Sequence, residues 1–356
     1  MNFSGFVRSR RPVQPLHAVR PRPLGRALRP LRGVAIAAVL IVAAAAGFAP
    51  AALAAPSAPK LDQPQAGFHR FRIGAIHVTA LSDGTVPLDV KVLAQVDPGA
   101  RDALLKQAFV SSPVDASVNA FLIEIGDRRI LIDAGAGELY GPTLDKLPAV
   151  LRAIGTPPEQ ITDILLTHIH TDHSGGLMAG NRRVFPHAIV HVDKRELAYW
   201  LTPGTAEQAR PEHKRLFQEA KVKVGPYVDA GKVQTFDGTT QLFPGLRSLP
   251  APGHTPGHSF YVLESQGAKL VFWGDILHIA EVQLPDPSVT IEFDADQKAA
   301  AAQRALAFTD AAREGYLVAA AHIAFPGIGH LRRDPGRTGY LWVPLAYIND
   351  AVEPTR

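Results

Sequence analysis

The sequence predicts an α/β protein built from two mixed β-sheets with helices on their outer faces. Two series of short apolar strands indicate the sheets, one between residues 71 and 133 and one between 246 and 321. Helical stretches lie between and within these series, an order that two helix-covered sheets accommodate. With 356 residues, of which 46% are apolar, the chain is long enough to bury a large core.

The first 55 residues are expected to be an export signal that is cleaved from the folded domain. Residues 1–32 hold eight arginines and no acidic residue, residues 33–55 are uncharged and mostly apolar, and Ala52-Leu53-Ala54 has the small-x-small pattern of a cleavage site. The alternative is an uncleaved membrane anchor, because residues 33–55 could just span a bilayer. We therefore predict an exported protein, periplasmic or secreted, that meets a membrane only through this segment.

The remaining chain is expected to form a flexible lead-in over 56–67, rich in Pro, Ala and Gln, and a single domain over 68–350. Residues 71–81 alternate and then meet Ser82-Asp83-Gly84, which predicts a strand and a turn. The other predicted strands cover 117–125, 129–133, 161–166, 246–250, 259–264, 269–273 and 317–321. The predicted helices cover 143–154, 194–201, 206–220 and 295–314, with Asp193 and Glu196 in capping-box spacing and Asp294 as the last helix cap.

Four potential metal ligands lie within six positions directly after the strand predicted at 161–166. They are His168, His170, Asp172 and His173, in the stretch Leu-Thr-His-Ile-His-Thr-Asp-His-Ser-Gly over 166–175. Side chains two apart in an extended segment point the same way, so His168 and His170 can face one pocket. The turn that follows can bring Asp172 and His173 to the same place. Imidazole and carboxylate groups suit zinc and similar divalent ions.

Three later turns supply further candidate ligands. His254 lies in a turn with two prolines and two glycines, Asp275 ends an apolar strand, and His322 follows the strand at 317–321. Seven ligands exceed the four that one tetrahedral zinc uses, which favours two ions that share a carboxylate. Zinc is the expected metal, and the ligand types also tolerate manganese, cobalt or iron.

Composition excludes several classes of function. The chain has no cysteine, which excludes disulfides, thiolate zinc ligands and a cysteine nucleophile. The formal charge of +4 belongs to the N-terminal extension, because removing its eight arginines from 37 basic residues leaves 29 against 33 acidic residues. No basic patch indicates nucleic acid as a partner.

As a set, the His-x-His-x-Asp-His motif, the three later ligands and Leu131-Ile-Asp-Ala-Gly resemble the metallo-β-lactamase superfamily. The resemblance implies a four-layer αββα sandwich with two metal ions. It assigns His168, His170 and His254 to one ion and Asp172, His173 and His322 to the other, with Asp275 as the bridge.

Segments 140–148, 173–180, 286–290 and 325–330 are also similar to the methyl parathion hydrolase family, which hydrolyses organophosphate triesters, and to its lactonase and arylesterase relatives. This resemblance implies a homodimer and an aromatic substrate pocket that includes Trp200 and Phe217. Tyr140 stands where the family has phenylalanine, which adds a hydroxyl to that pocket. Asp133 either orients a metal-binding histidine or bonds to its own turn. His258, His278 and His330 lie near the ligand segments and could support the ligands, but a structural role is expected for each.

The predicted function is that of an exported dinuclear hydrolase acting on apolar ester-like small molecules, either organophosphate triesters or lactones and aryl esters. Two ions about 3.5–4 Å apart would hold a hydroxide for attack on the substrate. Asp275 would keep the ions together, and either Asp172 or metal-bound water could supply a proton to a poor leaving group. The alternatives are a lactonase or arylesterase with little phosphotriesterase activity, and a non-catalytic metal-binding protein, which the complete ligand set disfavours.

Overall fold

The structure, a computed structural model, describes residues 67–348. The predicted export signal and almost all of the predicted lead-in lie outside this part of the chain. Within it, no helix is both long enough and apolar enough to cross a bilayer.

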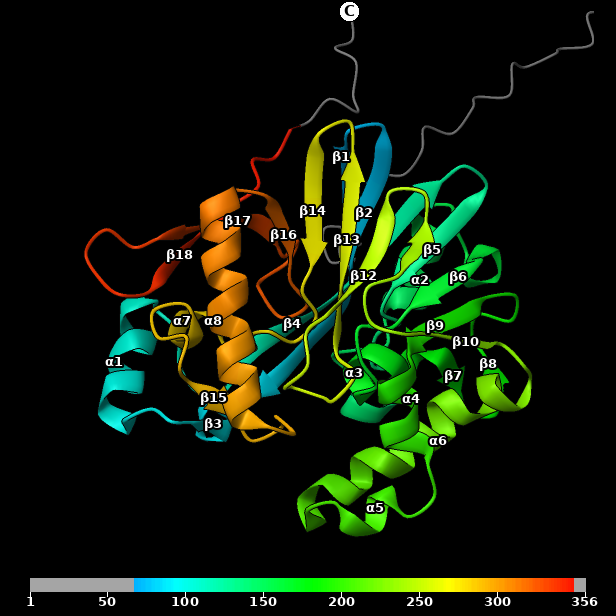
Figure 1. Ribbon diagram of the computed structural model, residues 1–356, viewed down its shortest axis with the longest axis horizontal. Coiled ribbons are helices and arrows are strands. Elements are labelled where there is room, and N and C mark those ends of the chain that lie inside the picture. The colour runs from blue at the N-terminus through cyan, green and yellow to red at the C-terminus, as the bar shows by residue number, and fades with distance from the viewer. Residues whose placement is uncertain (1–66, 349–356) are drawn as a thin grey trace, which may run out of the picture. The chain divides into compact units, whose positions relative to one another are not determined.

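Two seven-stranded mixed sheets form the centre of the described fold (Figure 1). The first has the order β1-β2-β4-β5-β6-β9-β10, with antiparallel pairing up to β5 and parallel pairing beyond it. Its strands are β1 (Phe68–Ile73), β2 (Ile76–Leu88), β4 (Val114–Ile125), β5 (Arg128–Ile132), β6 (Asp163–Leu165), β9 (Ile189–Asp193) and β10 (Val233–Phe236).

The second sheet has the order β11-β12-β13-β14-β16-β17-β18, in which only the β14–β16 pair is parallel. Its strands are β11 (Gln241–Phe243), β12 (Leu246–Pro250), β13 (Ser259–Ser265), β14 (Ala268–Phe272), β16 (Leu317–Ala319), β17 (Ile328–Arg333) and β18 (Tyr340–Pro344). Two short ribbons pair β3 (Leu93–Ala94) with β15 (Thr290–Ile291) and β7 (Met178–Ala179) with β8 (Arg182–Arg183).

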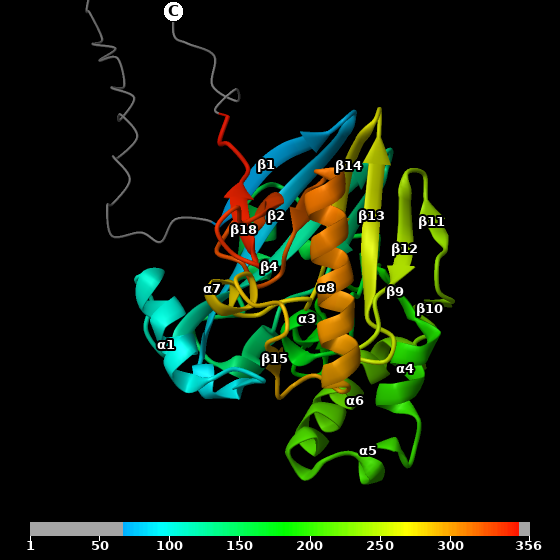
Figure 2. The ribbon, with the colours of Figure 1, turned by 60° about the vertical axis from the view of Figure 1, so that its left-hand side comes forward.

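Helices cover the outer faces of both sheets, and Figure 2 shows α8 running along the second sheet beside β13 and β14. The α-helices are α1 (Pro98–Gln107), α2 (Leu147–Ala153), α3 (Thr171–Ser174), α4 (Lys194–Leu201), α5 (Thr205–Gln208), α6 (Lys214–Asp229), α7 (Ala280–Gln283) and α8 (Gln297–Glu314). Short 3₁₀ turns cover Val90–Val92, Gly137–Tyr140, Pro158–Gln160, Gly175–Leu177 and Pro211–His213.

Three apolar layers hold this arrangement together. Phe121 and Ile123 of β4 face the second sheet, where the Phe121 ring lies 5.3 Å from that of Phe272. The alternate residue Leu122 faces the opposite way, into the core beneath α2, α4 and α6. On the far side of the second sheet, Trp273 stacks on Phe308 of α8. Because side chains alternate along each strand, apolar residues reach both faces of each sheet. The predicted four-layer fold class is confirmed.

The strand ends place polar groups along one edge of the sandwich. Asp133 follows β5, Thr167 and His168 follow β6, Asp275 follows β14, and His322 follows β16. Because β5 and β6 are parallel, as are β14 and β16, the carboxyl ends within each pair meet at the same edge. Open α/β sheets commonly bind ligands at this edge.

Three local predictions were wrong. Residues 71–81 form parts of two strands joined at Gly74 and Ala75, and Ser82–Gly84 is a bulge within β2 where Asp83 accepts hydrogen bonds from Ala136 N and Leu147 N. The helix predicted at 206–220 is divided, because Pro211 begins a separate 3₁₀ turn before α6. Asp296, rather than Asp294, caps α8 by accepting from Ala299 N.

Candidate metal centre

The first candidate metal site consists of three imidazoles and one carboxylate oxygen. His168 Nε2 lies 3.0 Å from His170 Nδ1, which lies 2.9 Å from His254 Nε2. Asp275 Oδ2 lies 3.3 Å from His254 Nε2 and 3.6 Å from His168 Nε2. All four side chains are buried, and their donor atoms lie within 4.8 Å of one another.

The second candidate site uses the other oxygen of Asp275. Asp275 Oδ1 lies 2.9 Å from His173 Nε2 and 3.0 Å from His322 Nε2. Asp172 Oδ2 completes the group at 3.6 Å from His173 Nε2 and 3.4 Å from His322 Nε2. The structure therefore brings all seven predicted ligands together in two groups of four that share Asp275.

Buried atoms without hydrogen bonds test whether these residues suit a metal. His173 Nε2, His322 Nε2 and Asp275 Oδ1 are each shielded from solvent and make no hydrogen bond. Buried polar atoms are normally paired, because an unpaired one loses its interaction with water. These atoms approach one another without aligning as donor and acceptor, as expected of ligands directed at a common point between them. The donor set of imidazole and carboxylate fits zinc and similar ions.

The far sides of the imidazole rings are held by fixed acceptors. His173 Nδ1 donates to Asp133 Oδ2 at 2.8 Å, His254 Nδ1 donates to Asp294 Oδ1 at 2.8 Å, and His322 Nδ1 donates to the Ser117 carbonyl at 2.7 Å. Such bonds fix the tautomer that leaves Nε2 free to bind a metal and hold the ring in orientation.

Asp133 takes the first of the two roles that the sequence left open, because it orients a candidate metal ligand and does not bond to its own turn. Its carboxylate holds the ring of His173 and also accepts from Thr167 N at 2.8 Å and Thr167 Oγ1 at 2.9 Å. Asp133 has a φ of 60°, in the left-handed region, at the point where β5 ends. One residue therefore joins the end of β5 to the ligand segment after β6.

Glu196 joins the first ligand segment to the turn that carries His254. Its fully buried carboxylate accepts from Ile169 N at 2.9 Å and Trp200 Nε1 at 2.6 Å on one oxygen, and from Thr255 Oγ1 at 2.7 Å and Gly257 N at 2.9 Å on the other. Burial raises the pKa of Glu196, and these four donors oppose that rise. Glu196 therefore fixes how His168 and His170 lie relative to His254.

The glycines after the ligand motif allow two loops to pack against each other. A Cβ on Gly175 would lie 2.1 Å from the Ala136 carbonyl oxygen, and one on Gly176 would lie 2.0 Å from that of Ala134. Both distances are far below van der Waals contact. Only glycine therefore lets the segment with His173 approach the loop with Asp133 this closely.

Charge is unevenly distributed over the two candidate sites. Burial holds the pKa of His168 and of His170 well below the usual value, so both rings are neutral and ready to bind a metal. Burial alone would also lower the pKa of His254, but Asp275 and Asp294 outweigh it and raise that pKa to about 9. Burial would raise the pKa of Asp275, but the surrounding histidines hold it well below the usual value. An ion that binds His254 must therefore displace a proton.

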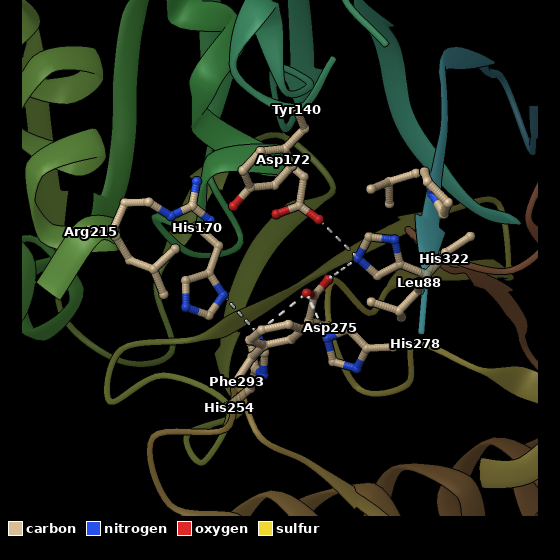
Figure 3. A pocket seen from close by; sticks show the side chains of 14 residues that line it. Leu88, Tyr140, His170, Asp172, Arg215, His254, Asp275, His278, Phe293 and His322 are labelled. Atoms are coloured by element: carbon tan, nitrogen blue, oxygen red, sulfur yellow. Dashed lines mark hydrogen bonds and ion pairs between the residues drawn. The ribbon is translucent and has the colours of Figure 1, made fainter. Parts of the chain in front are cut away.

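The candidate sites open into a cavity of about 380 Å³. Figure 3 shows Asp275 at its centre, with Tyr140 and Arg215 on one side and His278 and His322 on the other. Its remaining wall is mainly apolar and is formed by Val86, Pro87, Leu88, Ala116, Leu216 and Phe293. An apolar wall around a few convergent polar groups is typical of a small-molecule site.

Comparison with known proteins identifies the family. The family model of the metallo-β-lactamase superfamily matches residues 114–338, which include all seven candidate ligands. The chain belongs to the metallo-β-lactamase superfamily.

Within the superfamily, the chain is 34% identical to the hydrolase AbOPH, whose crystal structure covers 81% of this chain and 100% of its own with a TM-score of 0.77. It is 25% identical to AidC, a dizinc quorum-quenching lactonase solved with the product N-hexanoyl-L-homoserine, over 80% of this chain and 99% of AidC with a TM-score of 0.74.

Curated relatives match over shorter regions. An atrochrysone carboxyl ACP thioesterase of Pseudocercospora fijiensis is 30% identical over 44% of this chain and 36% of that protein. An N-acyl homoserine lactonase of a Bacillus species is 25% identical over 43% of this chain and 60% of the lactonase. The chain thus spans between about a third and three fifths of the length of these two proteins.

The predicted substrate residues differ in their placement in this superfamily fold. Tyr140 lines the cavity. Trp200 and Phe217 do not line it: they are buried behind the ligands, where the Trp200 ring lies 5.2 Å from that of His170 and 4.6 Å from that of Phe217. Amphipathic helix packing explains this, because α4 and α6 bury these faces against the first sheet.

The three histidines that were expected to be structural also differ in where they lie. His258 is fully buried, and its Nε2 accepts from Asp275 N at 3.0 Å, so it holds the proposed bridge from behind. His278 Nε2 lies 3.0 Å from Asp275 Oδ2, and its ring lines the cavity. His330 lies on β17, where its Nδ1 contacts the Gly315 carbonyl, and it belongs to neither candidate site.

Sequence reasoning missed Glu196, Asp294 and Arg215. The first two were interpreted as helix caps, which is the ordinary role of an acidic residue just before or within a first helical turn. Arg215 gave no signal, because a single arginine at a helix start is usually a solvated residue.

Proposed function

We propose that this protein is a dinuclear metal-dependent hydrolase of lactones and aryl esters. The observation that carries the proposal is the convergence of two four-ligand groups on Asp275 at the base of a mainly apolar cavity. Two bound divalent ions would polarise the electrophilic oxygen of a substrate and make a nucleophile available at neutral pH. Zinc is the proposed metal, in keeping with the dizinc lactonase AidC at 25% identity.

The chain's own residues position and orient the reactants. Val86, Leu88, Leu216 and Phe293 exclude water from the apolar part of a substrate. Burial, followed by the nearby charge of Asp172, raises the pKa of Tyr140, so its hydroxyl stays protonated and can donate a hydrogen bond to a substrate oxygen. Asp172 is only partly buried at the cavity wall and can pass a proton to a leaving oxygen.

A second candidate substrate class is the organophosphate triester. The apolar wall supports it, because a triester is neutral and needs no cation other than the bound metals for binding. The resemblance of segments 140–148 and 325–330 to methyl parathion hydrolase supports it as well. The Tyr140 hydroxyl favours the ester and lactone class, because it offers a donor that an apolar triester pocket does not use.

The test is a substrate panel on protein whose metal content is measured in the same sample. Dihydrocoumarin, phenyl acetate and methyl paraoxon separate lactonase, arylesterase and phosphotriesterase activity. Tyr140→Phe should lower kcat/KM for dihydrocoumarin by about tenfold, the effect of one hydrogen bond, and leave methyl paraoxon unchanged. His330→Ala is the matched control because it removes a histidine outside both candidate sites. Failure of the fully metallated protein to hydrolyse any of the three compounds would refute the proposal.

We further propose that residues 1–55 direct export and that the protein acts as a homodimer. Mass spectrometry of protein from the periplasm or medium should give an N-terminus near residue 55, whereas an intact N-terminus would favour the anchor. Sedimentation of the purified protein should give twice the mass of one chain.

A further inference from the structure

One ligand of the second candidate metal site, His322, lies in a loop without helix or strand. The loop covers residues 320–327 and joins β16 to β17. Its two ends are joined by hydrogen bonds from Ala320 N to the Gly327 carbonyl and from Gly327 N to the Ala324 carbonyl. Figure 3 shows His322 in the cavity wall beside Asp275. The position of this ring within the loop therefore depends on contacts from other parts of the chain.

Asn119 of β4, in the first sheet, supplies contacts on both sides of His322. Asn119 Nδ2 donates to the Ala320 carbonyl at 3.1 Å and to the Ile323 carbonyl at 2.8 Å. The backbone N–H of Asn119 donates to the Ala321 carbonyl at 3.0 Å. Three carbonyls around one candidate ligand are thus bonded to a single residue of the other sheet.

The ring and the main chain of His322 are held by different groups. The ring Nδ1 donates to the Ser117 carbonyl at 2.7 Å, which sets the orientation of the imidazole. This bond alone does not set the path of the main chain from which the ring extends. The Asn119 amide does so, because it bonds to the residue two before His322 and to the residue directly after it.

The first candidate metal site has the same arrangement around His254. Asp294 holds its ring at Nδ1, and Glu196 holds its turn by accepting from residues 255 and 257. Glu196 provides acceptors to N–H and O–H groups, whereas Asn119 provides donors to carbonyls. Each candidate site therefore has one group that orients a ring and another that fixes the main chain beside it.

The surroundings of Asn119 indicate that its two donors are needed. The side chain is buried, and its Oδ1 atom makes no hydrogen bond. A buried acceptor without a partner is destabilising, and an apolar side chain would avoid that cost. The loop also passes close to the amide, because a Cβ on Gly327 would lie 2.5 Å from Asn119 Nδ2. An asparagine here thus tolerates one unpaired oxygen while bonding to two carbonyls.

We propose that Asn119 is a positioning residue for the second candidate metal site and determines how tightly that site, but not the first, binds its ion. This inference rests on the two-metal function proposed above. Among the described residues, the Asn119 side chain bonds to the His322 loop and to no segment that carries another of the seven ligands. Its loss should therefore act through His322 alone.

The experiment is a zinc titration of the full chain by calorimetry, resolved into two binding events. Asn119→Leu keeps the number of heavy atoms and the branch point of the side chain and removes both donors. Asn119→Asp places an oxygen where Nδ2 lies, facing the same two carbonyl oxygens. Its negative charge would by itself attract a cation, so weaker zinc binding by this variant cannot arise from charge. Circular dichroism checks folding, and either variant is decisive if the other does not fold.

Two further proteins separate positioning from a general loss of stability. Leu122→Ala makes a cavity on the opposite face of β4, in the core beneath α2, α4 and α6. It should lower the urea midpoint and leave the affinities of both zinc events at the wild-type value. His322→Ala removes the ligand through which Asn119 is proposed to act and serves as the background for a double-mutant cycle.

Asn119→Leu and Asn119→Asp should each weaken one zinc event about 10–100-fold, the effect of losing an outer partner of a metal ligand. The other event should keep its wild-type affinity. In the His322→Ala protein, adding Asn119→Leu should leave the affinity for the remaining zinc unchanged, because the group that it positions is already absent.

Three results would overturn the assignment while leaving the proposed function intact. They are wild-type affinity of both events in the Asn119 variants, equal weakening of both events, and the same loss in the His322→Ala background as in the wild-type background. A selective loss in Leu122→Ala would overturn it as well, because any damage to β4 would then suffice. If the wild-type protein binds fewer than two zinc ions, the proposed function fails and this inference fails with it. If it binds two ions but hydrolyses no ester, only the proposed function fails.

Discussion

Replacing Glu196 with glutamine removes one negative charge and converts one acceptor oxygen into an NH₂ group. If the amide oxygen faces Ile169 N and Trp200 Nε1, the NH₂ group faces Thr255 Oγ1 and Gly257 N. The threonine hydroxyl can rotate and accept, but the Gly257 N–H then has no acceptor. The opposite amide orientation is worse, because it leaves both Ile169 N and Trp200 Nε1 without an acceptor.

The expected loss of stability follows from the single unpaired donor, the Gly257 N–H. A buried N–H without an acceptor costs about 1–3 kcal/mol. The segment has no room to relax, since even a Cβ on Gly257 would lie 2.2 Å from Glu196 N. Burial raises the pKa of Glu196, so the neutral amide also relieves part of the cost of a buried charge. We therefore expect Glu196→Gln to lower the free energy of unfolding by about 1–2 kcal/mol.

The larger effect should be on metal binding, because Glu196 fixes His168 and His170 relative to His254. Losing an outer partner of this kind lowers metal affinity about 10–100-fold. Zinc titration by calorimetry would measure the loss, and urea denaturation would measure the stability. The exposed Glu124→Gln on β4 is the matched control. Wild-type zinc affinity and an unfolding free energy within about 0.5 kcal/mol of wild type would refute the reasoning.

Three further predictions concern the metal centre itself. Asp275→Asn should reduce the metal content to at most about one ion per chain and lower kcat/KM at least about a thousandfold, since it weakens both groups at once; two ions per chain by elemental analysis would contradict this. Asp294→Ala should weaken zinc binding about 10–100-fold because it removes the acceptor of His254 Nδ1, and an unchanged zinc titration would count against that role. Because the pKa of His254 is raised to about 9 and those of His173 and His322 are raised as well, zinc must displace protons at neutral pH, so zinc affinity should rise as the pH increases from neutrality. Calorimetry in two buffers with different ionisation enthalpies should detect the released proton, and identical heats would exclude it.

The ligands could be predicted from sequence because each follows an apolar strand. Asp275 comes after β14 and His322 after β16, and parallel strands place both ends at one edge. His168 and His170 could be predicted for the same reason, because they lie two residues apart in the extended segment that follows β6. These sequence patterns are local, so they can be recognised without knowing how the two sheets pack.

The outer partners could not be predicted because their contacts are remote in the chain. Glu196 looks like part of a capping box, yet its carboxylate bonds to Ile169 and Gly257. Trp200 and Phe217 were expected in the pocket, yet the amphipathic faces of α4 and α6 turn them into the core. Whether a side chain on a helix faces the core or a ligand depends on the tilt of the helix, which the sequence pattern does not specify.

Asp275 follows a strand of the second sheet, whereas His168 and His173 follow a strand of the first. Each metal would therefore act as a further cross-link between two sheets that otherwise adhere through apolar side chains and a few hydrogen bonds, such as those from Tyr261 Oη to the Leu166 carbonyl and from His322 Nδ1 to the Ser117 carbonyl. We expect that the metal-free protein begins to unfold by separation of the two sheets. The supply of metal in the protein's surroundings then governs its lifetime as well as its catalysis.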